Sequence, residues 1–146
     1  MIQALQYALA DSAASTLESM CFSIPEGNAL IEATDLAFGV AVRFEGDFAG
    51  TMRLATSQAA ARELSASFLG ADPDEVSQEG AYSVLLELAN IICGATLSSY
   101  HKDGHFKLLA PQVVTAGVAP TDSDAVCSLQ LEAGPVAAAM TLERDA

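Results

Sequence analysis

The spacing of hydrophobic residues along the chain predicts three helices. Apolar residues recur at helical intervals over residues 2–21, which is typical of an amphipathic helix. Thr56 or Ser57 is suited to cap a second helix that extends through Phe68. A longer third helix, over about residues 77–100, is apolar on nearly every side. Such a helix belongs in the core of a folded domain.

Alternation of apolar and polar residues predicts strands before and after the last two helices. Residues 38–44 and 51–55 alternate and are separated by a short turn at residues 45–47, which indicates a hairpin. Further strands are expected at residues 106–109, 113–115, 125–131 and 135–142. The order of helix, strands, two helices and strands predicts an α+β domain, in which three helices pack on one face of an antiparallel sheet.

One polar stripe interrupts the third helix. Ser83, Glu87 and Asn90 are spaced by four and then three residues, so a helical advance of about 100° per residue places them within roughly 60° of each other. Glu87 and Asn90 are the only polar residues in the run VLLELANIIC, residues 84–93. Because packing does not account for them, we interpret this patch as functional.

Length and composition are those of one domain that covers residues 1–146. The hydrophobic content of 51% is high, yet no stretch approaches the roughly 18 uninterrupted apolar residues of a membrane span. The apolar excess must therefore enter a core or an interface. The first 20 residues lack the basic region that opens a secretion signal. We expect a cytoplasmic protein.

Charge narrows the range of partners. Six basic residues against nineteen acidic ones give a net charge of −13 at pH 7. This charge repels phosphate backbones and anionic lipids, so nucleic acid and membranes are not expected as partners. The same charge favours a protein partner with basic residues around its binding face, and it also serves as a general solubility device. Both interpretations are open at this point.

Cysteines and histidines do not indicate a metal site. Cys21, Cys93 and Cys127 are widely spaced in apolar surroundings, which suits buried free thiols. His101 and His105 flank a predicted turn without a further His or Cys beside them, so metal binding is not predicted.

The chemistry of the polar patch favours the positioning of water. Neither Glu87 nor Asn90 is a strong nucleophile, and the chain shows no Gly-rich phosphate loop. An amide can donate one hydrogen bond and accept another, so it can hold a water molecule in line with an electrophilic phosphorus. A carboxylate one turn away can pair with a lysine of a partner.

The spacing of Ser83, Glu87 and Asn90, followed by Pro111 some twenty residues later, resembles the motif of the CheC, CheX and FliY phosphatases of bacterial chemotaxis. A single copy of the motif makes the chain most similar to the CheX branch. The resemblance implies a CheC/CheX-like fold and an enzyme that hydrolyses the phospho-aspartate of a CheY-like response regulator. On the matching positions, Asn90 orients the attacking water and Glu87 pairs with a lysine of the regulator. Ser83 and Pro111 are supporting positions without a chemical step.

The resemblance also implies that the chain needs no cofactor of its own, because Mg²⁺ is held by the partner response regulator. It further implies a homodimer formed through the sheet. Two alternatives are open: a non-catalytic module that docks a receiver or another signalling protein, and a structural piece of a flagellar switch. The lack of a basic second domain in this sequence disfavours the latter.

A weak internal duplication is also visible. Glu18 and Cys21 in the first helix have the spacing of Glu87 and Asn90 in the third. Because a cysteine stands where a second amide would be, we expect one site only, on the third helix.

Overall fold

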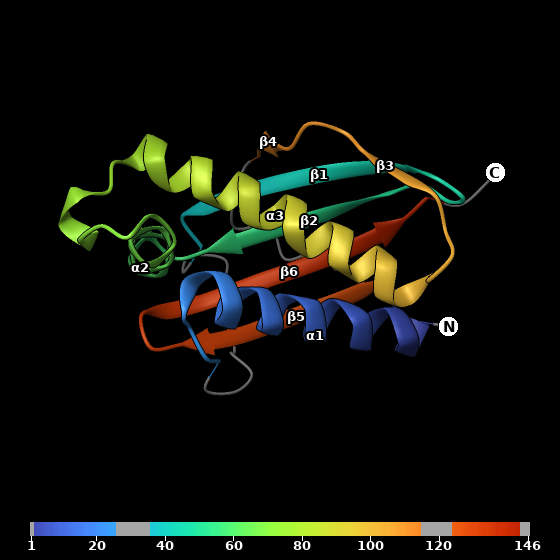
Figure 1. Ribbon diagram of the computed structural model, residues 1–146, viewed down its shortest axis with the longest axis horizontal. Coiled ribbons are helices and arrows are strands. Elements are labelled where there is room, and N and C mark those ends of the chain that lie inside the picture. Colours follow the sequence, from blue (N-terminus) through green and yellow to red (C-terminus); the bar gives the residue numbers. More distant parts are fainter. Residues whose placement is uncertain (1, 26–35, 115–123, 144–146) are drawn as a thin grey trace.

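The computed structural model describes residues 2–25, 36–114 and 124–143, which form a sheet covered by helices (Figure 1). The described helices are α1 (Ile2–Cys21), α2 (Gln58–Leu69) and α3 (Gln78–Tyr100), with a short 3₁₀ helix, η2 (Pro73–Glu75), before α3. The described strands are β1 (Phe38–Gly46), β2 (Gly50–Thr56), β3 (Phe106–Leu108), β4 (Gln112–Val113), β5 (Ala125–Leu131) and β6 (Gly134–Leu142).

The strands form an antiparallel sheet with the order β3-β1-β2-β6-β5, and β4 also pairs with β1. Its centre is the long β2–β6 pairing, which joins the hairpin of β1 and β2 to the hairpin of β5 and β6 in register from Gly50 opposite Leu142 to Thr56 opposite Val136. Because β3 and β4 both lie along the outer edge of β1, the chain that leaves α3 returns to the sheet beside β1.

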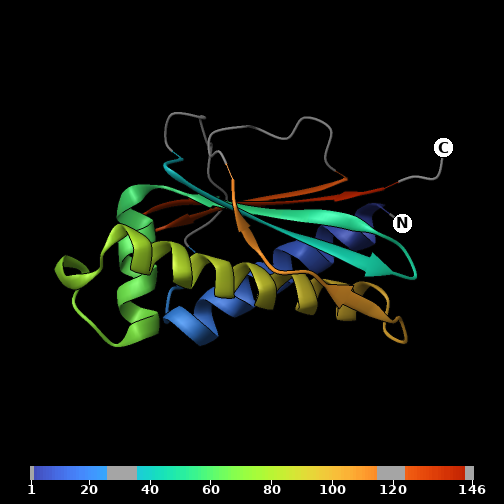
Figure 2. The same ribbon diagram turned by 90° about the horizontal axis from the view of Figure 1, so that it is seen from above.

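The helices cover one face of this sheet (Figure 2). α1 and α3 lie side by side across it, and α2 packs against both near one end (Figure 1). In β1 the alternate residues Val40, Val42 and Phe44 are buried beneath the helices, whereas Arg43 between them is partly exposed on the other face. This alternation follows from the two-residue period of a strand. The predicted α+β class, with three helices on one face of an antiparallel sheet, is confirmed.

The start and end of α2 follow local sequence signals. The Ser57 hydroxyl oxygen accepts a hydrogen bond from the Ala60 N–H at 3.2 Å, which identifies Ser57 as the N-cap. Thr56, the alternative cap, is the last residue of β2, and its hydroxyl donates to the Pro135 carbonyl at 2.8 Å. Gly70 ends the helix with φ of 68°, in the left-handed region that glycine adopts without strain.

The later strands lie close to their predicted positions. β5 has the predicted bounds, β6 begins one residue earlier, and β3 is one residue shorter than predicted. The strand predicted at residues 113–115 is β4, which begins one residue earlier and ends at Val113, so the prediction for Val114 was wrong; Thr115 lies outside the described residues.

α3 is a core helix. Its 23 residues have the length and apolar content of a membrane span, but one side of it packs against β1 and α1. The buried residues of α3 are Ala81, Val84, Leu85, Leu88, Ala89, Ile92, Cys93, Thr96 and Leu97. Its hydrophobicity is therefore accounted for by the core of the domain.

All three cysteines are buried free thiols, as predicted. Burial removes water that would stabilise the thiolate, so it raises the pKa of Cys21 to about 11 and the pKa of Cys93 to about 12. The pKa of Cys127 is raised for the same reason. These thiols stay protonated at neutral pH.

Candidate functional site

The candidate site lies on α3, whose start is fixed by its own sequence. Ser77 is the N-cap, and its hydroxyl oxygen accepts a hydrogen bond from the Gly80 N–H at 2.9 Å. From there the helix continues without a break to Tyr100. The predicted polar stripe is therefore carried by a single helix.

α3 brings three of the predicted residues onto one face. Ser83 and Glu87 are exposed, and Asn90 is half-buried at the border between this face and the core. Their spacing on a regular helix keeps all three within about 60° of each other. The structure thus places a carboxylate and an amide next to each other at the surface side of a helix whose other side is buried.

The Asn90 amide is not committed to a structural hydrogen bond through its oxygen. Oδ1 of Asn90 is buried and accepts no hydrogen bond from the part of the chain that the structure describes. A buried acceptor without a partner costs about 1–3 kcal/mol, so natural proteins retain few of them. The side chain is thus poorly explained as a structural element of the core.

The Glu87 carboxylate is also uncommitted. It is exposed, and none of the ion pairs between described residues involves it. Arg43 forms ion pairs with Glu45 and Glu143, and neither of these carboxylates lies on α3. Glu87 is therefore available to a cation of another molecule.

Pro111 lies in a bulge between β3 and β4 and not in a strand. Phe44 pairs with Leu108 and Val40 pairs with Val113, so four steps along β1 correspond to five steps along the returning chain. One extra residue of this kind forms a β-bulge, where a backbone N–H has no partner in the ladder. A proline, which has no backbone N–H, is therefore tolerated there. Pro111 thus precedes β4, which contacts α3, and it is not part of the stripe itself.

The structure adds a feature that the sequence reasoning missed, an open groove of about 660 Å³ between the start of α3 and β4. We call it the α3–β4 groove. Its lining residues are Ser77, Gln78, Glu79, Tyr82, Ser83, Leu86 and Val113. The sequence feature that could have indicated this groove is the apolar character of the whole of α3. A helix that buries only one side leaves apolar residues such as Leu86 outside the core.

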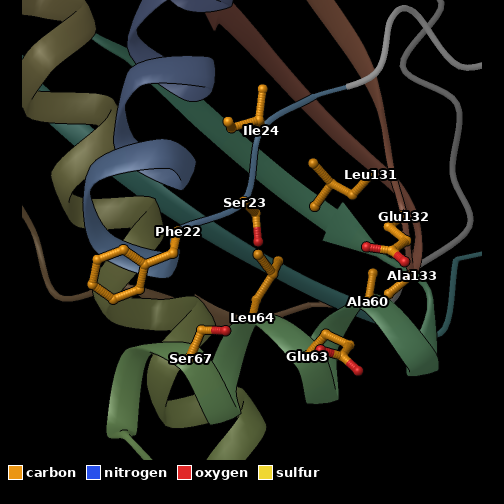
Figure 3. Close-up of a pocket in the computed structure, with 10 residues that line it drawn as sticks. All are labelled: Phe22, Ser23, Ile24, Ala60, Glu63, Leu64, Ser67, Leu131, Glu132 and Ala133. Carbon is orange, nitrogen blue, oxygen red and sulfur yellow. The ribbon is translucent and has the colours of Figure 1, made fainter.

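A second hollow, of about 580 Å³, lies where α1 ends (Figure 3). Its lining comes from the segment after α1, from α2 and from the β5–β6 turn. Phe22 and Ile24 on its border are 80% and 69% exposed, and Glu63 and Glu132 contribute carboxylates. No amide side chain is among the described residues that line it, so it does not repeat the chemistry of the stripe.

The first half of the suspected duplication has no amide at the position that corresponds to Asn90. Glu18 on α1 is exposed like Glu87, but Cys21 is fully buried. The position that corresponds to Asn90 is therefore occupied by a protonated thiol in the core.

The two histidines contact neighbouring groups of the fold. His101 lies 3.4 Å from the Asp47 carboxylate and packs edge-on against Phe48 and Phe106. The His105 backbone N–H donates to the same carboxylate at 3.1 Å. Among the described residues, no three metal-ligating side chains come together.

Comparison with known proteins places the chain in one family. The family model of chemotaxis phosphatase CheX matches residues 38–129. Among solved structures, the chain resembles the chemotaxis protein CheX from Desulfovibrio desulfuricans, with a TM-score of 0.73 and 16% identity over 95% of this chain and 99% of that chain.

Two further structures have the same fold. One is the CheX–CheY–BeF₃–Mg²⁺ complex from Borrelia burgdorferi, with a TM-score of 0.71 and 16% identity over 94% of this chain and 97% of that chain. The other is CheX from Vibrio vulnificus, with a TM-score of 0.72 and 16% identity over 95% of this chain and 96% of that chain. No curated protein matches the sequence.

Proposed function

The chain belongs to the CheX family of chemotaxis phosphatases, and from this premise we propose that it hydrolyses the phospho-aspartate of a CheY-like response regulator. The observation that carries the proposal is the stripe on α3, where Glu87 and the half-buried amide of Asn90 lie on one face, and neither the carboxylate nor the amide oxygen has a partner among the described residues. The complex of a CheX with a CheY from Borrelia burgdorferi supports the choice of partner.

Asn90 positions the attacking water in this proposal. The Asn90 side chain must turn outward for this step, because Oδ1 is buried in the structure. Its oxygen then accepts a hydrogen bond from the water and its NH₂ group donates one, which fixes the direction of the water lone pair. The water oxygen attacks phosphorus, the bond between phosphorus and the aspartate oxygen breaks, and the products are the free carboxylate and inorganic phosphate. Because the transition state of phosphoryl transfer is loose, correct placement of the water is a large part of the catalysis that a protein can add.

Glu87 holds the regulator in place. We assign to it a salt bridge with a lysine of the regulator's active site, one helical turn from the amide that orients the water. The regulator supplies the Mg²⁺, so the chain itself contributes no cofactor. Ser83 and Pro111 support the site: Ser83 continues the stripe, and Pro111 helps to place β4 beside α3. The reaction takes place in the cytoplasm in this proposal.

The Asn90→Ala variant tests the catalytic assignment. We expect phosphate release from a phosphorylated CheY-like receiver of the same genome to fall by at least about 100-fold, because the water loses its orientation while the exposed carboxylate remains. The measurement is single-turnover release of inorganic phosphate at a saturating concentration of the variant.

The matched control is Ser99→Ala, an exposed position on the same helix but about 180° from Asn90. It should release phosphate at the parent rate. An Asn90→Ala variant that is folded and as fast as the parent would exclude the catalytic role. A parent chain that binds the receiver without releasing phosphate would instead support the alternative, a non-catalytic docking module.

A further inference from the structure

The two walls of the α3–β4 groove are both held by contacts with β1. On the helix side, the Tyr82 ring packs against the buried Phe38 with ring centroids 4.7 Å apart. On the strand side, Val113 pairs with Val40 of β1, and the next residue, Val114, donates its backbone N–H to the Gly39 carbonyl at 3.0 Å. Both walls are therefore anchored to β1 and do not need to be ordered when a ligand binds.

The floor of this groove is apolar and accessible. Val113 is 52% exposed, although it is a β-branched residue in a paired strand. Leu86 and Tyr82 are half-buried beside it. Isolated apolar residues at a surface need no explanation, but here side chains from two separate elements meet in one groove. Such a groove suits an apolar side chain of another molecule.

The groove is continuous with the proposed catalytic stripe. Ser83 lines the groove and is also the first residue of the stripe, and the rise of an α-helix puts it only about 10 Å from Asn90. A typical protein interface covers about 800 Å² on each partner, which corresponds to a radius of roughly 16 Å. A receiver that reaches Asn90 with its phosphorylated aspartate therefore covers the groove as well.

The charge around the groove determines what can enter it. Glu79 is an exposed carboxylate in the lining, and Glu87 is an exposed carboxylate on the stripe that begins at the groove with Ser83. The described lining contains no lysine or arginine. An acidic partner surface would be repelled, whereas an apolar residue with a neighbouring lysine or arginine fits both the floor and the border.

We propose that the α3–β4 groove is a docking subsite for the receiver, in which Tyr82, Leu86 and Val113 bind one apolar side chain of the receiver surface and Glu79 pairs with a basic residue next to it. This inference rests on the proposed function, because the occupant is the same receiver that presents its phospho-aspartate to Asn90. The groove contributes binding and does not contribute to the chemical step.

Two substitutions test the subsite with little disturbance of the fold. Leu86→Gln keeps the helix propensity, and Val113→Thr keeps the β-branched shape. The matched controls are Leu69→Gln and Val126→Thr, which change exposed residues of the same types on α2 and β5. Thermal unfolding of all four variants verifies that they are folded.

Binding is measured by calorimetry with the receiver loaded with beryllium fluoride and Mg²⁺, and turnover is measured with the phosphorylated receiver. We expect Leu86→Gln to raise both Kd and KM on the order of tenfold, because the apolar contact between Leu86 and the receiver is lost. Val113→Thr should raise both constants severalfold. Both variants should keep the kcat of the parent within twofold. The two controls should keep the Kd, KM and kcat of the parent.

The outcomes separate this inference from the proposed function. A parent that binds the receiver but releases no phosphate contradicts the phosphatase proposal, and the Kd values then still decide the role of the groove. The subsite is overturned if Kd is the same in parent, Leu86→Gln and Val113→Thr, if the controls weaken binding as much, or if the parent does not bind the receiver.

Discussion

At the scale of single residues, α3 combines a reactive surface with an inert core. Cys93 lies less than one turn from Asn90 but is fully buried, with its pKa raised to about 12 by the loss of hydration of the thiolate. The nucleophile of the proposed reaction is a water molecule, so the thiol contributes packing alone. Its raised pKa has a consequence for stability.

The pKa of Cys93 predicts a loss of stability at alkaline pH. A pKa raised above the ordinary value of 9.0 means that the folded state holds its proton more tightly than the unfolded state. The contribution to stability is therefore complete below pH 9 and is lost as the pH rises through about 12. Between pH 8 and pH 11 we expect Cys93 to lower the free energy of unfolding by roughly 2 kcal/mol.

Urea unfolding of the parent and of Cys93→Ala at several pH values measures this effect. Burial also raises the pKa values of Cys21 and Cys127, but these thiols are common to both proteins and cancel in the comparison. The variant should be less stable at pH 8, and the gap to the parent should narrow towards pH 11. If the free energies of unfolding of parent and variant changed in parallel with pH, Cys93 would have the same pKa in the folded and the unfolded state.

Whether a contact between two residues can be predicted depends on how far apart the two residues are in the sequence. The Ser57 cap and the Glu87–Asn90 spacing involve residues three apart, and helix geometry alone fixes their relation. The roles of these two residues stay predictions. Val113 reaches α3 only because β4 pairs with a strand more than 70 residues earlier, as Val40 opposite Val113 shows. The groove was therefore beyond a reading of local sequence.

At the scale of elements, the two edges of the sheet differ. One edge is formed by the short strands β3 and β4, which both pair with β1. The β5 edge is met by a side chain of α1: the Val126 N–H donates to Oε1 of Gln6 at 2.8 Å, and Nε2 of Gln6 donates to the Val126 carbonyl. A glutamine amide thus takes the place of a neighbouring strand at this residue, which protects an edge that would otherwise pair with another chain.

Gln6 gives the predicted homodimer a specific test. If two copies associate through their β5 edges, Gln6 must leave Val126 in each copy, so Gln6→Ala should favour the dimer. Two hydrogen bonds per copy are four per dimer, and at about 0.5 kcal/mol or more each they correspond to a dimer Kd that is lower by about 30-fold or more. Light scattering and sedimentation of parent and variant at micromolar concentrations measure this Kd.

Gln3→Ala is the matched control, because Gln3 is exposed on the same helix and none of the hydrogen bonds between described residues involves its side chain. A Kd unchanged by Gln6→Ala would place the dimer interface elsewhere. A parent and a Gln6→Ala variant that both stay monomeric would contradict the homodimer.

At the scale of the whole molecule, the class of the fold was predictable and the arrangement of strands was not. Hydrophobic periodicity and the order of elements indicated a helix-covered antiparallel sheet, because each element needs another surface to bury its apolar face. The central pairing of β2 with β6 joins residues about 80 or more positions apart, such as Thr56 and Val136. Nothing in either strand specifies that partner, so the order of strands appears only in the structure.

The net charge of −13 belongs to the whole molecule and predicts how association depends on salt. A field of this size attracts a partner whose binding face is basic, and salt screens it with a Debye length of about 8 Å at physiological ionic strength. We expect KM for the phosphorylated receiver to rise about tenfold between roughly 0.03 and 0.3 M salt, with kcat unchanged, because the chemical step occurs after docking. Glu87→Gln should give a shallower salt dependence, since it removes one direct pair, whereas Glu63→Gln on α2 should keep the slope of the parent. A KM independent of salt would mean that the acidic surface serves solubility and does not guide the receiver to α3.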